Sequence, residues 1–161
     1  MVSEYIMSSL EKVLVSACFL GQKVRYNGQV KPLINEYLSL WSKQNRLMAI
    51  CPEVRGGLPV PRPPAEISQQ TGQVITITNV DVTEQFSSGA QQALQLCLQH
   101  NIRFALLKES SPSCGSRTIY DGNFSQQKIS GQGITTKLLQ QNNIQVFSED
   151  SIEELVLAMK N

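Results

Sequence analysis

The chain has 161 residues, of which 41% are hydrophobic and 17% are charged, and its formal net charge is +1. This length is typical of one domain with an apolar core of ordinary size, and the composition argues against disorder. A net charge near zero excludes the strong electrostatic footprint of a protein that binds long nucleic acids. Four cysteines and one histidine remain, and composition alone does not explain them.

Two further exclusions concern membranes and export. The longest apolar stretch, residues 13–21, spans about nine residues, whereas a bilayer requires about 20. The opening MVSEYIMSSLEK carries two glutamates and lacks a basic region ahead of an apolar core, so it does not resemble a signal peptide. We therefore expect no membrane partner and a cytoplasmic location, where thiols stay reduced.

Short apolar runs alternate with longer amphipathic segments along the chain. In chain order they predict a strand over 12–17, a helix over 33–45, strands over 46–51 and 74–77, a helix over 81–99, a strand over 104–107, a helix beginning after 133, a strand over 144–147 and a closing helix from 151. This alternation predicts a three-layer αβα sandwich with a mainly parallel, Rossmann-like central sheet of about five strands. We expect a single α/β domain over 1–161, with 1–11 as an N-terminal extension and no additional C-terminal domain.

Three connections are much longer than the two to six residues usual in such folds. They cover residues 18–32, 51–66 and 109–133, and each follows a predicted strand at its carboxyl end. In open α/β sheets ligands bind at this edge. Cys18, Cys51 and Cys114 lie in these connections, so we expect the three thiols to share one edge of the sheet. Cys97 falls on the apolar side of a predicted helix, and we interpret it as packing.

The spacing of these cysteines favours some metal sites over others. Zinc sites commonly use close pairs such as C-x-x-C, and the chain contains none. His100 ends a predicted helix near the opposite edge and is a poor fourth ligand. A redox dithiol would need only two of the three thiols. Three thiolates without a fourth protein ligand suit an iron–sulfur cluster with one open iron, the kind of position that substrate-binding metal chemistry requires.

Other polar residues cluster near the same edge. Glu53 follows Cys51 by two residues and is a candidate general base. The segment Ser111-Pro-Ser-Cys-Gly115 is typical of a rigid turn that presents hydroxyls and backbone N–H groups. Nearby basic residues that could hold an anionic substrate group are Arg25, Lys31, Arg62 and Lys108. Our candidate substrate contacts are Arg25, Lys108 and Ser113.

A series of motifs in one order carries a family resemblance. They are Val15-Ser-Ala-Cys-Phe-Leu-Gly21, Val24-Arg-Tyr-Asn-Gly28, Cys51-Pro-Glu-Val-Arg-Gly-Gly-Leu-Pro59, Arg62-Pro-Pro-Ala-Glu66, Asp81-Val-Thr83, Ser111-Pro-Ser-Cys-Gly115, Ile119-Tyr-Asp-Gly122 and Gly131-Gln-Gly-Ile-Thr135. Over residues 12–150 the chain resembles a bacterial family long labelled as a domain of unknown function, whose characterised members are thiouracil desulfidases (TudS-like). Asn27 and the stretch from Ser125 depart from the family pattern, which bears on substrate preference.

The resemblance implies a function and assigns residues to it. It implies a [4Fe-4S] cluster held by Cys18, Cys51 and Cys114, with Glu53 and Ser111 as catalytic residues. The implied reaction converts a thiouracil-type base to uracil and hydrogen sulfide without net redox change. It needs no nicotinamide or flavin, and no glycine-rich stretch of the chain matches G-x-G-x-x-G or a P-loop.

Three alternatives remain open at this point. The same cluster could desulfurise another thiolated small molecule, such as a thionucleotide or a thioamide. The site could instead be a closed metal or cluster centre of a sensor that catalyses nothing. The third alternative is a small-molecule-binding α/β domain whose three thiols carry no metal. The sequence leaves the oligomeric state undetermined.

Overall fold

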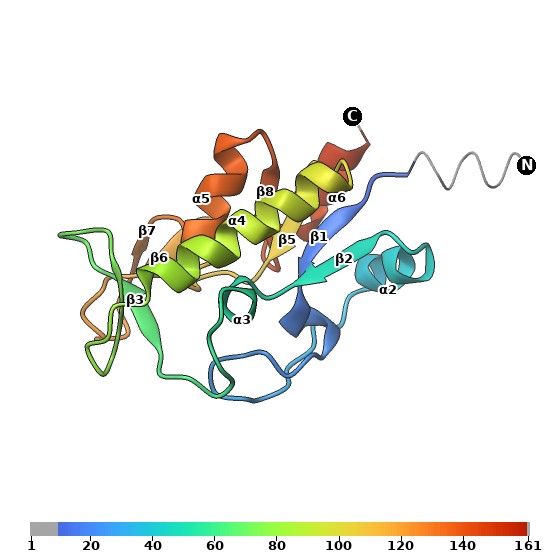
Figure 1. Ribbon diagram of the computed structural model, residues 1–161. Coiled ribbons are helices and arrows are strands. Elements are labelled where there is room, and N and C mark those ends of the chain that lie inside the picture. The colour runs from blue at the N-terminus through green and yellow to red at the C-terminus, as the bar shows by residue number, and fades with distance from the viewer. Residues whose placement is uncertain (1–9, 161) are drawn as a thin grey trace, which may run out of the picture.

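Four parallel strands form the central sheet of the protein. The computed structural model describes residues 10–160, so most of the expected 1–11 extension lies outside the described residues. The strands are β1 (Val13–Ser16), β2 (Leu47–Ile50), β5 (Phe104–Leu107) and β8 (Gln145–Ser148), in the order β2-β1-β5-β8 (Figure 1). Val13 stands opposite Leu47 on one side and Phe104 on the other. The predicted parallel α/β sheet is confirmed.

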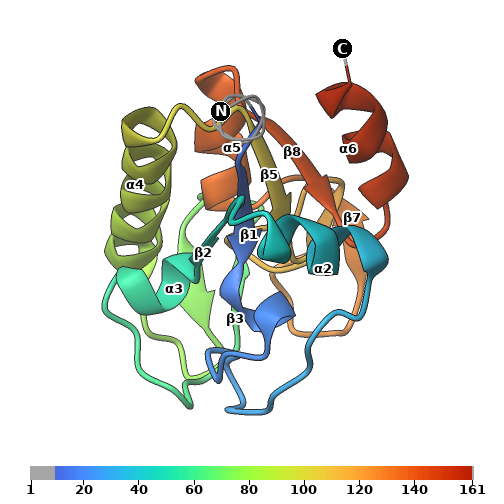
Figure 2. The same ribbon diagram turned by 90° about the vertical axis from the view of Figure 1, so that its right-hand side faces the viewer.

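Helices cover both faces of this sheet. The helices α4 (Thr83–Gln99) and α5 (Ile134–Gln141) pack on one face, and α2 (Glu36–Lys43) and α6 (Ile152–Met159) pack on the other. Figure 2 shows α4 and α6 on opposite sides of the strands. Along β1 and β5 alternate residues enter the two cores, because successive side chains of a strand point to opposite faces. Leu14, Ala105 and Leu107 join the first core, and Val13, Val15, Phe104 and Leu106 join the second.

The predicted strand over 74–77 lies outside the central sheet, which therefore has four strands and not five. It forms β4 (Val74–Thr76) and pairs antiparallel with β3 (Ala65–Ile67). A second hairpin, β6 (Thr118–Tyr120) with β7 (Lys128–Ser130), lies inside the expected connection over 109–133. A run of three apolar or β-branched residues predicts a strand, but it does not show which other strand that strand pairs with. Both hairpins pack with Phe86 of α4 in a third apolar cluster.

A close contact between two helices positions the connection after β2. The short helix α3 (Pro52–Arg55) follows Cys51 directly and packs on α4. A Cβ atom on Gly89 of α4 would lie 1.8 Å from the carbonyl oxygen of Pro52, and one on Gly56 would lie 1.9 Å from that of Gln85. Only glycine permits this approach. The packing against α4 thus fixes the position of Glu53 in α3 and of Cys51 directly before it.

Among the residues that the structure describes, none of the helices combines the length and the apolar character that crossing a membrane demands.

Candidate active site

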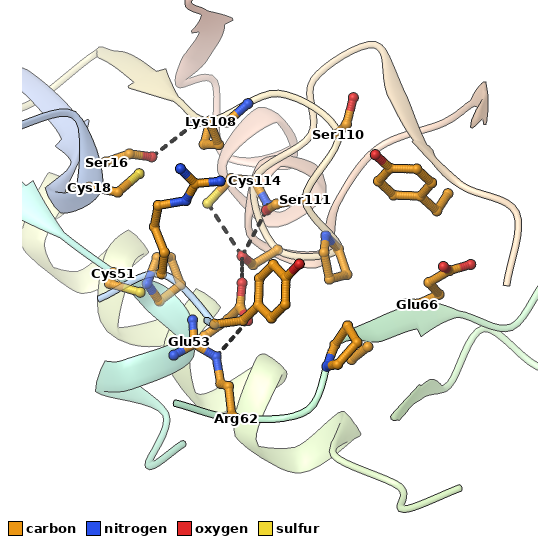
Figure 3. Close-up of a pocket in the computed structure, with 18 of the residues that line it drawn as sticks. Ser16, Cys18, Cys51, Glu53, Arg62, Glu66, Lys108, Ser110, Ser111 and Cys114 are labelled. Atoms are coloured by element: carbon orange, nitrogen blue, oxygen red, sulfur yellow. Dashed lines mark hydrogen bonds and ion pairs between the residues drawn. The ribbon is translucent and has the colours of Figure 1, made fainter. Parts of the chain in front are cut away.

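A cavity of about 590 Å³ opens at the carboxyl edge of the central sheet. Its wall is built from the segments after β1, β2 and β5, together with parts of both hairpins. Cys18, Cys51 and Cys114 all line it (Figure 3). Cys18 lies in the 3-10 helix η1 (Ala17–Leu20), Cys51 precedes α3, and Cys114 lies in the connection after β5. The structure therefore brings together three thiols that are up to 96 positions apart in sequence.

The other candidate metal ligands lie elsewhere. Cys97 is a residue of α4 that is buried in the core, and His100 is exposed at the end of that helix. Across residues 10–160, no three His, Cys, Asp or Glu side chains lie close enough together to hold a single metal ion. A cluster has a different requirement, because each cysteine binds a separate iron. Three free thiols on three segments around one cavity fit that requirement, and soft thiolates are the ligands that iron–sulfur clusters use.

Burial controls the protonation of these thiols. Burial raises the pKa of Cys18 to about 11 and that of Cys114 to about 12, and it also raises the pKa of Cys51. These values include a smaller upward effect of the neighbouring cysteines on the pKa of Cys18 and of Cys114, and a downward effect of the positive charges of Lys108 and Arg25 on that of Cys18. A group that binds thiolates must therefore displace protons here.

Glu53 projects into the cavity from the first turn of α3, and both of its oxygens are held. Its Oε1 accepts a hydrogen bond of 3.1 Å from Arg62 Nε, and its Oε2 accepts one of 3.0 Å from the Ser113 hydroxyl (Figure 3). The side chain of Glu53 is 15% exposed and that of Arg62 only 5%. Arg62, which the sequence offers as a basic residue that could hold an anionic substrate group, is paired with Glu53 in the structure.

The turn after β5 places two hydroxyls beside the third thiol. Ser111 Oγ accepts a hydrogen bond of 2.8 Å from the Cys114 backbone N–H, so it fixes the turn that carries this cysteine. The Ser111 and Ser113 hydroxyls lie 3.2 Å apart, and Ser113 Oγ lies 3.4 Å from Cys114 Sγ. Ser113 is buried and links Glu53 to Ser111. Ser111 does not bond to Glu53 directly.

The remaining basic candidates differ in position. Arg25 lines the cavity. Lys108 also lines it, and its ammonium lies 2.6 Å from Glu149 Oε2. Lys31 is exposed and is not part of the cavity wall. Substrate contacts by Arg25, Lys108 and Ser113 stay predictions.

Sequence reasoning missed Glu109, a buried carboxylate that organises the same turn. It accepts five hydrogen bonds, from the backbone N–H groups of Ser110, Ser116, Arg117 and Thr118 and from the Ser116 hydroxyl. Burial alone would raise the pKa of Glu109, but these hydrogen bonds outweigh it and lower the pKa to about 2. The available signal was an acid two residues after a buried strand and ahead of a run of serines.

The fold and the cavity define an α/β protein with a three-cysteine site at the carboxyl edge of its sheet. A family model described as 2-thiouracil desulfurase matches residues 13–151. The chain therefore belongs to the 2-thiouracil desulfurase family, and the resemblance found in its motifs is confirmed.

Two individual proteins are similar over nearly the whole chain. One is a solved structure described as the [4Fe-4S]-dependent thiouracil desulfidase TudS, with 54% sequence identity and a TM-score of 0.90; the match covers 93% of this chain and 98% of that one. The other is the uncharacterized protein YbbK of Bacillus subtilis (strain 168), which is 38% identical over 152 residues, or 89% of this chain and 99% of YbbK.

Proposed function

We propose that this chain is a [4Fe-4S]-dependent thiouracil desulfidase that converts a thiouracil to uracil and hydrogen sulfide. The observation that carries the proposal is the arrangement of Cys18, Cys51 and Cys114 around one cavity beside Glu53. Membership of the 2-thiouracil desulfurase family and the similarity to TudS support it. A volume of about 590 Å³ lies within the range of small-molecule sites.

The three cysteines are the proposed cluster ligands. Cys18, Cys51 and Cys114 would hold three irons of a [4Fe-4S] cluster, and the iron left without a protein ligand would supply a Lewis acid able to polarise a C=S bond. The overall reaction is a hydrolysis: oxygen from water forms the new bond to the ring carbon, the carbon–sulfur bond breaks, and the sulfur leaves with two protons. No electrons are transferred, so the reaction needs no redox cofactor.

Glu53 is the proposed general base. Its side chain lines the cavity, and its carboxylate is held by hydrogen bonds on both oxygens. In this position it can take a proton from the attacking water and later return one to the leaving sulfur. Ser111 is proposed to hydrogen-bond the reacting ring, and Ser113 keeps Glu53 and Ser111 in a fixed relation.

The substrate and the setting follow from the same features. A net charge of +1 gives no basis for binding a nucleic-acid polymer, so we propose a small thiolated base or nucleotide as substrate. Three free thiols are best preserved where the environment is reducing, which supports a cytoplasmic location.

Anaerobic reconstitution tests this function. The reconstituted chain should bind about four irons and release sulfide and uracil in equal amounts from 2-thiouracil or 4-thiouracil, and its absorption spectrum should change when the thione is added. A full cluster with no sulfide from either thione would refute the proposed function. Sulfide from a thioamide but not from a thiouracil would point to a different thiolated substrate.

A further inference from the structure

We propose that Arg62 is a positioning residue for the reaction, holding the Glu53 carboxylate toward the cysteine-lined cavity and joining it to the loop over Val24–Tyr26. This inference rests on the proposed function, because it takes Glu53 as the catalytic base. Arg62 lies between the Cys51 motif and β3, at the head of the motif Arg62-Pro-Pro-Ala-Glu66, and the resemblance assigns it no role.

The hydrogen bonds of the Arg62 guanidinium reach three separate parts of the chain. Nε donates to Glu53 Oε1 over 3.1 Å, Nη1 to the Pro59 carbonyl over 3.2 Å, and Nη2 to the Val24 carbonyl over 2.9 Å. The Arg62 backbone N–H also donates to the Tyr26 carbonyl over 2.7 Å. All three guanidinium nitrogens are thus engaged in a largely buried site.

The same contacts extend to the cavity wall. Val24 and Tyr26, which Arg62 holds by their carbonyls, line the cavity together with Arg25 between them. Val24 O also accepts a hydrogen bond of 3.9 Å from Cys51 Sγ. Arg62 therefore fixes the position of the proposed base, Glu53, relative to the loop over Val24–Tyr26.

A second cavity explains why Glu53 needs such a partner. It has a volume of about 240 Å³, and its mostly apolar walls include Leu58, Val82 and Phe86. Glu53 and Arg62 line both cavities, so their ion pair lies between them. Because the pair lines two cavities, fewer side chains surround it than surround a residue of the core. Hydrogen bonds from Arg62 and Ser113 confine the carboxylate instead, and a misplacement of about 1 Å can lower a rate about 10²-fold.

Lysine is a suitable test substitution at this position. It keeps the positive charge, but an ammonium group cannot reproduce the planar fork that reaches three acceptors. Arg62→Lys should lower kcat for sulfide release by about tenfold to 10²-fold, while KM changes less than about twofold. Iron per chain should equal that of the wild-type protein. The matched control is Arg55→Lys, an exposed arginine of α3 that bonds to Gln92 and does not line the cavity.

A double-mutant cycle separates positioning from other roles. If Arg62 acts through Glu53, adding Arg62→Lys to Glu53→Gln should lower the single-turnover rate by less than about twofold further. If Arg62→Lys lowered the rate of the Glu53→Gln variant by the same factor as that of the wild type, the proposal would be overturned. A raised KM with unchanged kcat would make Arg62 a substrate contact, and iron loss in proportion to the lost rate would make its role structural.

A measurement that needs no activity completes the test. Because Arg62 holds the Val24 carbonyl, Arg62→Lys should speed amide hydrogen exchange in the segment over residues 22–28, whereas Arg55→Lys should not. Unchanged exchange would refute the link to this loop. Absence of sulfide release by the wild-type chain, with faster exchange in Arg62→Lys, would count against the proposed function and not against the contact made by Arg62.

Discussion

The Ser113 hydroxyl donates a hydrogen bond of 3.0 Å to the Glu53 carboxylate across 60 positions of the chain. With the hydrogen bond of Arg62 on the other carboxylate oxygen, it holds Glu53 from two sides. The Ser111 hydroxyl lies 3.2 Å from that of Ser113 and caps the Cys114 N–H. A chain of hydrogen bonds therefore connects Glu53, the proposed base, to the segment that carries Cys114, the third proposed cluster ligand.

Replacing the cysteines one at a time tests the ligand set. Cys18→Ala, Cys51→Ala and Cys114→Ala should each lose most of the about four irons per chain of a [4Fe-4S] cluster. Cys97→Ala is the matched control, because Cys97 is buried in the core and does not line the cavity. It should keep the iron and lose only about 1 kcal/mol of stability. Iron analysis and urea unfolding measure both effects, and loss of iron in Cys97→Ala alone would contradict the assignment.

Removing the charge of Glu53 tests the base. Glu53→Gln keeps the shape of the side chain but cannot accept a proton, so kcat should fall by about 10²–10⁴-fold. The visible absorption of the reconstituted protein should remain, since Glu53 is not a proposed ligand. Glu84→Gln changes an exposed glutamate of α4 and should leave the rate unchanged. Full turnover in Glu53→Gln would remove this residue from the mechanism.

Ser113→Ala tests the link between Glu53 and Ser111. A hydrogen bond to a charged group contributes about 1.5–3 kcal/mol, so loss of this donor should reduce kcat by at least about tenfold. The residue is only 1% exposed, and an unchanged KM would separate an effect through Glu53 from the loss of a substrate contact. Steady-state sulfide release measures it, with the exposed Ser130→Ala as control. Equal rates in both variants would show that Ser111 and Glu53 work independently.

The contact between α3 and α4 predicts a severe effect of one methyl group. In Gly89→Ala the new Cβ meets the Pro52 carbonyl at 1.8 Å, so α3 must move. Overpacking of this kind destabilises by about 1–3 kcal/mol. Because Cys51 adjoins α3, iron content after reconstitution should fall as well. Gln91→Ala, at an exposed position of the same helix, should be as stable as the wild type in urea; equal stability of Gly89→Ala would contradict the close packing.

The buried Glu109 predicts a pH dependence of stability. Its pKa is about 2 in the folded protein against an ordinary value of 4.5, so it stabilises the fold fully above about pH 4.5. This contribution, about 3 kcal/mol, should disappear as the pH falls from about 4.5 to about 2. Glu109→Gln should therefore be less stable than the wild type in urea at pH 7, and the difference should shrink toward pH 2. A difference that does not vary with pH would show that the charge of Glu109 is unimportant.

Much of the architecture could be predicted from hydrophobic periodicity. The alternation of strands and helices defined a parallel sheet, and a parallel sheet brings the carboxyl ends of its strands to one edge. For that reason the placement of Cys18, Cys51 and Cys114 on a shared edge followed from their positions after three strands. The strand over 74–77 was expected in the central sheet, which was wrong. Its antiparallel pairing with β3 depends on a contact between two segments, and the local hydrophobic pattern does not encode such a contact.

The sequence by itself determined the family, the layers of the fold and the three proposed cluster ligands, because these depend on local periodicity and on residue types in order. Only the tertiary structure decided that Arg62 pairs with Glu53, that Ser113 joins Glu53 to Ser111, and that Glu109 ties together the segments on either side of Cys114. Contacts such as those of Arg62 with Val24, 38 positions away, depend on how the connections fold over one edge of the sheet. Hydrogen bonds between loops have no period along the chain, so they become visible only when the loops are placed in space.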